Sequence, residues 1–287
     1  MINQFADFME VEKNYSKRTI KEYVYDLKLF EKYINKNLLL ASSGDVRSFL
    51  ATLKREKSYQ ACGLVRKQAT LRSFFKFCRR EKKIEGNPLE FIESPKMPER
   101  QPVYLTEEER RAIFEVVHGQ TYTIRGKRDF ALICLLYYAG LRVSELVGLN
   151  VSDVQRDGER VNLKVIGKGN KERKVPLRAE AQEALQTWLQ NRPSTGEGNS
   201  AIFINTKTKK RLTTRMVQIL VKKLAVKTGI AKNITPHKFR HTFGTRLLQQ
   251  GANLVDIQAL LGHASLNTTR IYTHTNPERL EEAVSKL

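Results

Sequence analysis

One proline-rich segment limits the folds open to this chain more than any other feature. The stretch ESPKMPERQP holds three prolines and several charged residues in ten positions. Proline fixes φ and removes a backbone donor, so this stretch can continue neither a helix nor a central strand. Directly after it, Thr106 with Glu109 three residues later predicts a helix start with a capping box. The sequence therefore predicts two domains and a linker, at residues 1–92, 106–287 and 93–105 respectively.

The first domain shows only helical periodicity. Ser16 can cap a helix whose single apolar stripe is formed by Ile20, Tyr23, Val24, Leu27 and Phe30. Further helical patterns run through residues 45–54 and 58–83, and Gly63 leaves open a break in the second of them. No stretch shows the period of two that a strand needs. We therefore expect this domain to be entirely helical.

The second domain mixes helices with short strands. Residues 127–139 predict a buried helix that ends at Gly140, where a left-handed residue is needed. Positions 161–165 alternate apolar and polar, and the turn residues of GKGNKE lead to a return strand at 173–177, which predicts a β-hairpin. The apolar run AIFIN at 201–205 predicts a third strand. The fold class expected for the chain is mainly α with a small β-sheet.

The charge of the chain indicates a polyanionic partner. Lys and Arg number 51 against 30 acidic residues, which gives a net charge of +21. Each phosphate that such a protein neutralises releases a counterion, so nucleic acid fits this composition. There is no run of 18 apolar residues and no signal-peptide pattern, so we expect no membrane partner and a cytoplasmic, nucleoid-associated protein. The three cysteines lack metal spacing and are expected to be reduced thiols.

Positive charge is most concentrated in residues 51–83. This stretch holds 11 Lys or Arg and 2 acidic residues, a net charge of +9. Such an excess repels itself without a partner, although a solvated helix face is the ordinary interpretation of a charge run. We predict that DNA is contacted by six basic side chains of this stretch, namely Arg66, Lys67, Arg72, Lys76, Arg79 and Arg80.

The sequence offers no site for a nucleotide or a metal ion. It contains no P-loop pattern. His237 and His241 lie four positions apart on a predicted helix, a spacing that fits zinc, but Lys238 occupies the position of a zinc protease's glutamate, and nearby cations disfavour a metal ion. No carboxylate cluster suits magnesium. We therefore expect neither a metal nor a cofactor.

The same helix carries a basic face. Thr235 can cap it, Pro236 suits its first position, and Gly251 can end it. One side of this helix is basic or small, with His237, Arg240, His241 and Gly244. Another side is apolar and expected in the core, with Phe239, Phe243 and Leu247. A basic face near a helix N-terminus is a suitable seat for a phosphate group.

A second helix follows, capped by Asn253 and ended by Gly262. His263 comes next, and Tyr272 lies nine residues later. Taken alone, His263 has two equally good interpretations, as a phosphate ligand or as a histidine bonded to the backbone at a helix end. A lone tyrosine needs no special role.

Five segments of the chain resemble the tyrosine recombinases, a family that includes phage integrases and Xer-type resolvases. They are AGLRVSEL (139–146), VIGKGNKER (165–173), HKFRHTFGT (237–245), LLGHASLNTT (260–269) and YTH (272–274). Their order and spacing are those of the family. The resemblance covers the whole chain, because the N-terminal half is similar to the family's core-binding domain and residues 106–287 to its catalytic domain. It implies an enzyme acting on double-stranded DNA.

The resemblance also implies a role for each matching residue. Tyr272 is similar to the nucleophile that attacks the scissile phosphate and leaves a 3′-phosphotyrosine and a free 5′-hydroxyl. Arg142 and Arg240 resemble the paired clamps on the non-bridging oxygens, which neutralise charge in the transition state. Glu145 is expected to orient Arg142, unless it is merely a surface glutamate on a short helix.

Three further roles follow in the same way. Lys168, at the hairpin tip, resembles the lysine that protonates the departing 5′-oxygen. His237 resembles the general base or proton relay near the tyrosine, and His263 a hydrogen-bond donor to the phosphate. Because the bond energy is kept in the phosphotyrosine ester, rejoining requires neither ATP nor a metal.

The resemblance favours an Xer-type recombinase that resolves chromosome or plasmid multimers, with links to chromosome segregation and cell division. It would act as a tetramer on two DNA sites, alone or with a second recombinase or a DNA translocase. Contact between protomers is expected through a C-terminal helix with the stripe Leu280, Ala283, Val284 and Leu287, which could instead dock on its own domain. The alternatives are an integrase of a mobile element, for which an additional domain before Phe5 is common, a type IB topoisomerase, and a catalytically silent DNA-binding protein.

Overall fold

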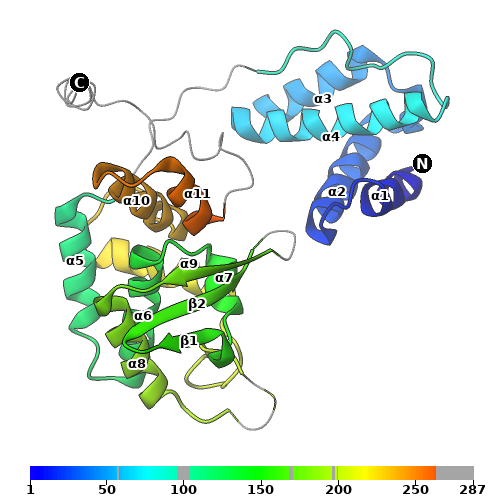
Figure 1. Cartoon of the computed structure of the whole chain (residues 1–287). Coiled ribbons are helices and arrows are strands. Elements are labelled where there is room, and N and C mark those ends of the chain that lie inside the picture. The colour runs from blue at the N-terminus through cyan, green and yellow to red at the C-terminus, as the bar shows by residue number, and fades with distance from the viewer. Residues whose placement is uncertain (57, 96–103, 168–170, 196–197, 199, 263–287) are drawn as a thin grey trace, which may run out of the picture. The chain divides into compact units, whose positions relative to one another are not determined.

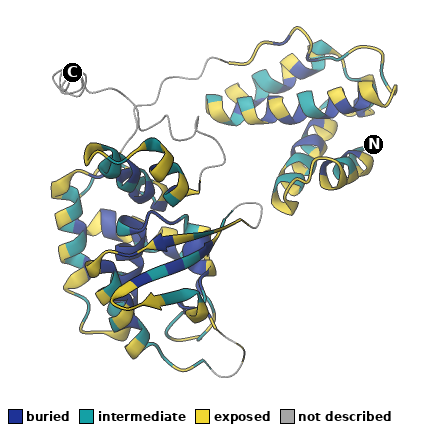
Figure 2. Ribbon diagram, viewed as in Figure 1, coloured by how far each residue is buried: buried dark blue, intermediate teal, exposed yellow. Residues whose placement is uncertain are grey.

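The computed structural model describes residues 1–56, 58–95, 104–167, 171–195, 198 and 200–262. The chain divides into two compact units, Met1–Arg100 and Gln101–Leu287 (Figure 1). The division falls inside the segment predicted as the linker. Buried and exposed residues alternate along the helices of both units, as expected of helices with one face in a core (Figure 2).

The described part of unit 1 is entirely helical, as predicted. Its elements are α1 (Ile2–Val11), α2 (Lys17–Ile34), the 3-10 helix η1 (Leu38–Leu40), α3 (Ser43–Arg55) and α4 (Ala61–Arg80). Ser16 caps α2 by accepting a hydrogen bond from the backbone N–H of Thr19. The helix α4 runs unbroken past Gly63, where the sequence had left a break open. Buried aromatic side chains, among them Phe5, Phe30 and Phe74, form the core of this unit.

Unit 2 contains a three-stranded antiparallel sheet. Its strands lie in chain order as β1 (Val154–Asp157), β2 (Arg160–Ile166) and β3 (Glu172–Pro176). The predicted hairpin is therefore confirmed as β2 and β3, with Val165 opposite Arg173. The strand β1 was not predicted from the sequence, because it is short and its residues are only partly buried or exposed.

The prediction of a strand at 201–205 is wrong. Ala201 and Ile204 each form only an isolated bridge, outside the sheet. The segment Ala201–Ile204 is fully buried, and its carbonyl groups accept hydrogen bonds from side chains. The indole of Trp188 donates to Ile202 O at 3.0 Å, and a guanidinium N–H of Arg128 donates to Ile204 O at 3.1 Å. The apolar run therefore indicated burial rather than strand pairing.

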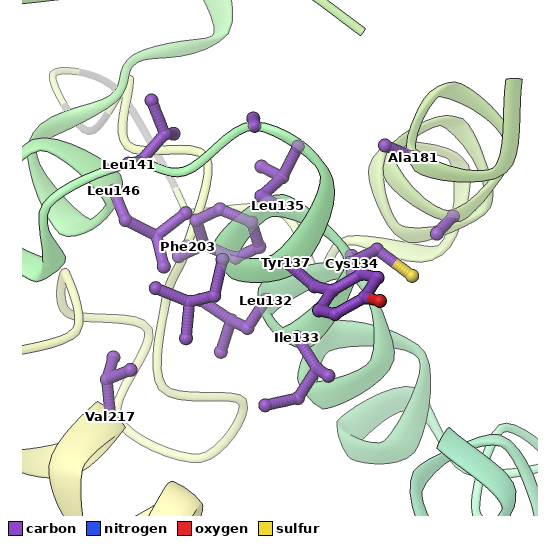
Figure 3. Close-up of a cluster of buried hydrophobic side chains, with 14 of the residues drawn as sticks. Leu132, Ile133, Cys134, Leu135, Tyr137, Leu141, Leu146, Ala181, Phe203 and Val217 are labelled. Carbon is purple, nitrogen blue, oxygen red and sulfur yellow. The ribbon is translucent and has the colours of Figure 1, made fainter. Parts of the chain in front are cut away.

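Helices of unit 2 enclose one hydrophobic core together with the sheet. They are α5 (Glu107–His118), α6 (Ile124–Tyr138), α7 (Val143–Gly148), the 3-10 helix η2 (Val151–Asp153), α8 (Ala179–Asn191), α9 (Thr214–Lys227), α10 (Pro236–Gln249) and α11 (Leu254–Leu261). The capping box of Thr106 and Glu109 is present at the start of α5. Side chains of α6 such as Leu132 and Leu135 meet Leu146 of α7 in the core (Figure 3).

The turn after α6 has the predicted left-handed glycine. Gly140 has a φ of +59°, and a Cβ at this position would lie 2.3 Å from the ring of Phe243. Only glycine fits this close approach between the turn and α10. Phe239 is buried as predicted, but Phe243 and Leu247 are only partly buried, so the apolar side of α10 is narrower than the sequence indicated.

The three cysteines all lie in the described part of the chain. Cys78 and Cys134 are buried and Cys62 is exposed, and all three are free thiols. Burial raises the pKa of Cys134 to about 12, so this thiol stays protonated at neutral pH. Within the described part of the chain, no helix is both long and apolar enough to span a membrane.

Candidate active site

Three of the six predicted catalytic residues belong to the described chain, and three do not. Arg142 is the N-cap residue of α7, directly after the turn that follows α6. His237 and Arg240 lie in the first turns of α10. The predicted residues outside the described part are Lys168, His263 and Tyr272, and so is the C-terminal stripe of Leu280, Ala283, Val284 and Leu287.

Glu145 connects the two predicted arginine clamps. Its carboxylate accepts hydrogen bonds of 2.8 Å from both the backbone N–H and the guanidinium of Arg142. A guanidinium nitrogen of Arg240 lies 3.9 Å from the same carboxylate. The Glu145 side chain is only 4% exposed, so its interpretation as a surface glutamate is wrong. The carboxylate holds Arg142 in one orientation.

The carboxyl group of Glu145 stays ionised in this setting. Burial alone would raise its pKa, but hydrogen bonds from Arg173 and Arg142 and the positive charge of Arg173 hold the pKa below its usual value. A lowered pKa in the folded state means that the charged network stabilises the fold above the pKa of the unfolded chain, about 4.3. This contribution is lost as the pH falls through the folded pKa.

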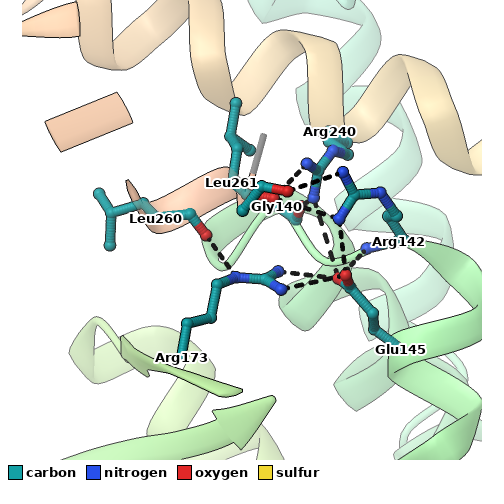
Figure 4. A network of polar contacts seen from close by, with 8 residues as sticks. Gly140, Arg142, Glu145, Arg173, Arg240, Leu260 and Leu261 are labelled. Carbon is teal, nitrogen blue, oxygen red and sulfur yellow. Dashed lines mark hydrogen bonds and ion pairs between the residues drawn. The ribbon is translucent and has the colours of Figure 1, made fainter. Parts of the chain in front are cut away.

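The C-terminal end of α11 accepts hydrogen bonds from both clamps (Figure 4). Arg142 donates to Leu261 O at 3.3 Å and to Gly262 O at 3.1 Å. Arg240 donates to Leu261 O, and to Gly140 O at 2.7 Å. The last carbonyl groups of a helix have no partner within the helix and carry partial negative charge, which attracts guanidinium groups. The two arginines thus share Leu261 O as an acceptor, two positions before His263 in the sequence.

His237 is exposed beside this arginine pair. Desolvation by the surrounding chain, and then the charges of Arg240 and Arg142, lower the pKa of His237 below its usual value. The imidazole is therefore mostly neutral at neutral pH and can accept a proton. His241 is partly buried, and desolvation followed by the charge of Lys238 lowers its pKa as well. Among the residues that the structure describes, no group of three or more His, Cys, Asp or Glu could hold a metal ion.

Comparison with known proteins identifies the family. A model of the phage integrase family matches residues 103–279, and a model of the phage integrase N-terminal SAM-like domain matches residues 2–82. The chain belongs to the phage integrase family. The tyrosine recombinase XerC of Oceanobacillus iheyensis is 37% identical to it over 294 residues, which cover 99% of this chain and 94% of the relative. XerC of Leptospira interrogans is 37% identical over 286 residues, covering 99% and 91%.

Solved structures agree with this assignment. XerH site-specific recombinase bound to palindromic difH substrate, in a post-cleavage complex, matches with a TM-score of 0.78 and 26% identity, covering 99% of this chain and 84% of that one. The XerA recombinase matches with a TM-score of 0.55 and 30% identity, covering 99% and 96%. This chain is an Xer-type tyrosine recombinase, an enzyme that cleaves and rejoins DNA at specific sites.

Arg173 of the candidate site was not predicted from the sequence to have a role of its own. Arg173 of β3 donates two hydrogen bonds to Glu145, of 3.0 and 2.8 Å, and a third of 2.8 Å to Leu260 O. A signal for it was present in the sequence. Arg173 shares its face of the strand with the buried Val175, and a charged residue on an inward-facing position needs a charged or polar partner.

A hollow beside Arg142 joins the clamp to the base of the hairpin. Its volume is about 320 Å³, and its lining includes Arg142, Glu145, Lys164 and Gly167. The N–H of Gly167 donates to the carbonyl of Lys171 at 2.8 Å, which closes the hairpin just before and after the tip. Arg142 and Gly167, the last described residue before the hairpin tip, therefore line the same hollow.

The six basic residues predicted to contact DNA fall into different settings on α4. Lys67 is only 1% exposed, and its ammonium group lies 2.7 Å from the equally buried Asp26, so its prediction as a DNA contact is wrong. A buried, paired ammonium cannot reach a phosphate. Arg72 donates to Ile92 O at 2.7 Å and is partly buried. The four others are exposed, namely Arg66, Lys76, Arg79 and Arg80.

Three of those exposed residues share one stripe of α4. At 100° per residue, Arg66, Lys76 and Arg80 lie within about 80° of one another, and Arg79 flanks this arc, about 60° beyond Lys76. Arg66 is oriented by Asp26 at 2.7 Å, and Arg80 lies 3.2 Å from Glu12. This stripe is called the α4 basic stripe below.

Proposed function

We propose that the nucleophile of this recombinase is Tyr272 and that Arg142 and Arg240 clamp the scissile phosphate. The observation that carries the proposal is the convergence of both guanidinium groups on Glu145 and on the end of α11. Cleavage adds negative charge to the phosphate oxygens, and donors already in place stabilise that charge without further reorganisation. Neutral carbonyl groups are weaker acceptors than phosphate oxygens. DNA binding is therefore favoured when a phosphate replaces backbone carbonyl groups as the acceptor of hydrogen bonds from the two arginines.

The remaining steps need two proton transfers. The neutral imidazole of His237 is suited to take the proton of the tyrosine hydroxyl. Lys168 would give a proton to the departing 5′-oxygen, and His263 would donate a hydrogen bond to the phosphate. The phosphotyrosine ester keeps the energy of the broken bond, so a 5′-hydroxyl from another strand can attack it and restore the DNA. No step requires a nucleotide or a metal ion.

The linkage of the intermediate tests this proposal. We expect the protein to become attached to the 3′-phosphate side of a nicked suicide duplex, because attack by the tyrosine releases the 5′-hydroxyl. Duplexes labelled on one side or the other of the cleavage site, incubated with protein and separated on denaturing gels, distinguish the two linkages. The proposed chemistry predicts that the protein retains the label of the fragment on the 5′ side of the break, which ends in the 3′-phosphate. Label retained only from the fragment on the 3′ side, which would mean a 5′-phosphotyrosine, would contradict it.

We further propose that the biological reaction is the resolution of chromosome or plasmid multimers, which would link the protein to the nucleoid, chromosome segregation and cell division. The similarity to XerC over nearly the whole chain supports this role. Exchange between two sites requires that four strands be cut and rejoined while both duplexes are held together, so a tetramer is the assembly that fits. The C-terminal segment after Tyr272 is the proposed contact between protomers.

The α4 basic stripe is the proposed DNA contact of unit 1. We expect an Arg66→Ala and Lys76→Ala double variant to weaken binding and to reduce the slope of log affinity against log salt by about 1.8, because each phosphate contact contributes about 0.9. Fluorescence anisotropy between low and moderate salt measures the slope. Arg18→Ala, which removes an exposed arginine of α2, is the control, and an equal loss of slope in this control would contradict the stripe.

A further inference from the structure

Arg173 occupies a junction between three segments of the candidate active site. It is the second residue of β3, just after the hairpin, and its side chain is 11% exposed. Two of its nitrogens donate to the two oxygens of Glu145, and its Nε donates to Leu260 O at 2.8 Å. Figure 4 shows the guanidinium between the carboxylate and the end of α11. Each of the three guanidinium nitrogens of Arg173 therefore donates a hydrogen bond.

We propose that Arg173 is a positioning residue for DNA cleavage. It acts on Arg142 through Glu145, on the end of α11 through Leu260, and on the hairpin through its own place in β3. These are the segments that carry or precede the residues of the proposed chemistry, so the inference rests on the proposed function. Arg173 itself need not touch the phosphate.

The surroundings of the guanidinium leave it little freedom. Gly262 has a φ of +61°, and a Cβ at this position would lie 3.0 Å from a guanidinium nitrogen of Arg173 and 3.2 Å from its Cδ. A Cβ at Gly167 would lie 3.5 Å from the same nitrogen. The guanidinium therefore lies close to both the end of α11 and the base of the hairpin. A displacement of the Arg173 side chain would therefore also displace the end of α11 and the base of the hairpin.

The charge of Arg173 is not sufficient for this role. Its planar fork provides two parallel hydrogen bonds to a carboxylate and a third in another direction, whereas a lysine offers one compact charge. Without the fork, Glu145 would still pair with Arg142, but the carboxylate could rotate. A displacement of about 1 Å in a catalytic group can cost on the order of 100-fold in rate.

An Arg173→Lys variant separates positioning from charge and from folding. We expect its Tm and its Kd for DNA to stay close to those of the wild type. We expect the rate of covalent complex formation at saturating protein to fall about 30- to 100-fold, because the chemical step depends on the placement of Arg142. Arg156→Ala, which removes an exposed arginine from the edge strand β1 of the same sheet, is the control and should leave the rate unchanged.

A double-mutant cycle with Glu145→Gln tests the route of the effect. If Arg173 acts through Glu145, the loss in the double variant is clearly smaller than the product of the two single losses. Multiplicative losses would overturn the proposed route. A normal cleavage rate in Arg173→Lys, or a reduced rate that follows a loss of Tm and affinity, would overturn the positioning role.

The same gels contain Tyr272→Phe as a reference. A covalent complex formed by that variant would overturn the proposed function and this inference together. Absence of the complex in Tyr272→Phe, combined with a normal rate in Arg173→Lys, would overturn the inference alone.

Discussion

Replacing Tyr272 by phenylalanine is expected to abolish the covalent complex with DNA while affinity stays within about twofold. The substitution removes one hydroxyl oxygen and keeps the ring, so the binding residues elsewhere are unaffected. No other group of the proposed site can form a stable ester with the scissile phosphate under the same conditions. Denaturing gels of a suicide duplex measure the adduct, and gel shifts under native conditions measure affinity.

Tyr122→Phe is the matched control for this variant. Tyr122 is 84% exposed in unit 2, and its substitution makes the same chemical change away from the candidate site. It should form the adduct at the rate of the wild type. An adduct of normal intensity from Tyr272→Phe would contradict the assignment of the nucleophile, and the covalently attached peptide would then identify the residue in its place.

Replacing Asp26 by asparagine is expected to destabilise unit 1 by about 3–5 kcal/mol, because it leaves a buried cation without its counter-charge. Lys67 and Asp26 are each 1% exposed, and their charged atoms lie 2.7 Å apart between α2 and α4. The hydroxyl of Thr70 also donates to Asp26, at 3.3 Å. Arg66, the other cation on this carboxylate, is 42% exposed and can be hydrated instead.

Thermal unfolding followed by circular dichroism measures the effect. For a unit of this size, 1 kcal/mol corresponds to roughly 4–8 °C in Tm, so we expect the Tm of unit 1 to fall by at least 10 °C, as an order of magnitude. An Asp26→Leu and Lys67→Met double variant is the control, since replacing both charges by apolar groups is often close to neutral. A double variant as unstable as Asp26→Asn would show that packing, not charge, is responsible.

Local sequence signals predicted most of the secondary structure. The caps at Ser16 and Thr106, the glycine that ends α6 and the alternation in β2 each depend on residues a few positions apart. Such signals act before any tertiary contact is made, so they can be recognised in the sequence. They failed for AIFIN, because burial in a strand and burial in an extended segment require the same apolar residues.

The sequence supplied the residues of the proposed site but not the connections between them. The sequence indicated a basic helix face with His237 and Arg240, and the family resemblance added Arg142. It left the role of Glu145 open, because a glutamate three positions after an arginine on a short helix is equally common at the surface. The buried carboxylate and its partners Arg142 and Arg173 appear only when α7 packs beside β3.

The sequence by itself determined the two-part organisation, the helical N-terminal unit and the hairpin, because each depends on local signals. Only the tertiary structure decided which charges are buried and what they pair with. Lys67 pairs with Asp26, which lies 41 positions away in the sequence. Arg142 donates a hydrogen bond to Gly262 O, which lies 120 positions away. A buried charge requires a partner, but the sequence does not state where the chain will supply it, because that depends on how distant helices and strands pack.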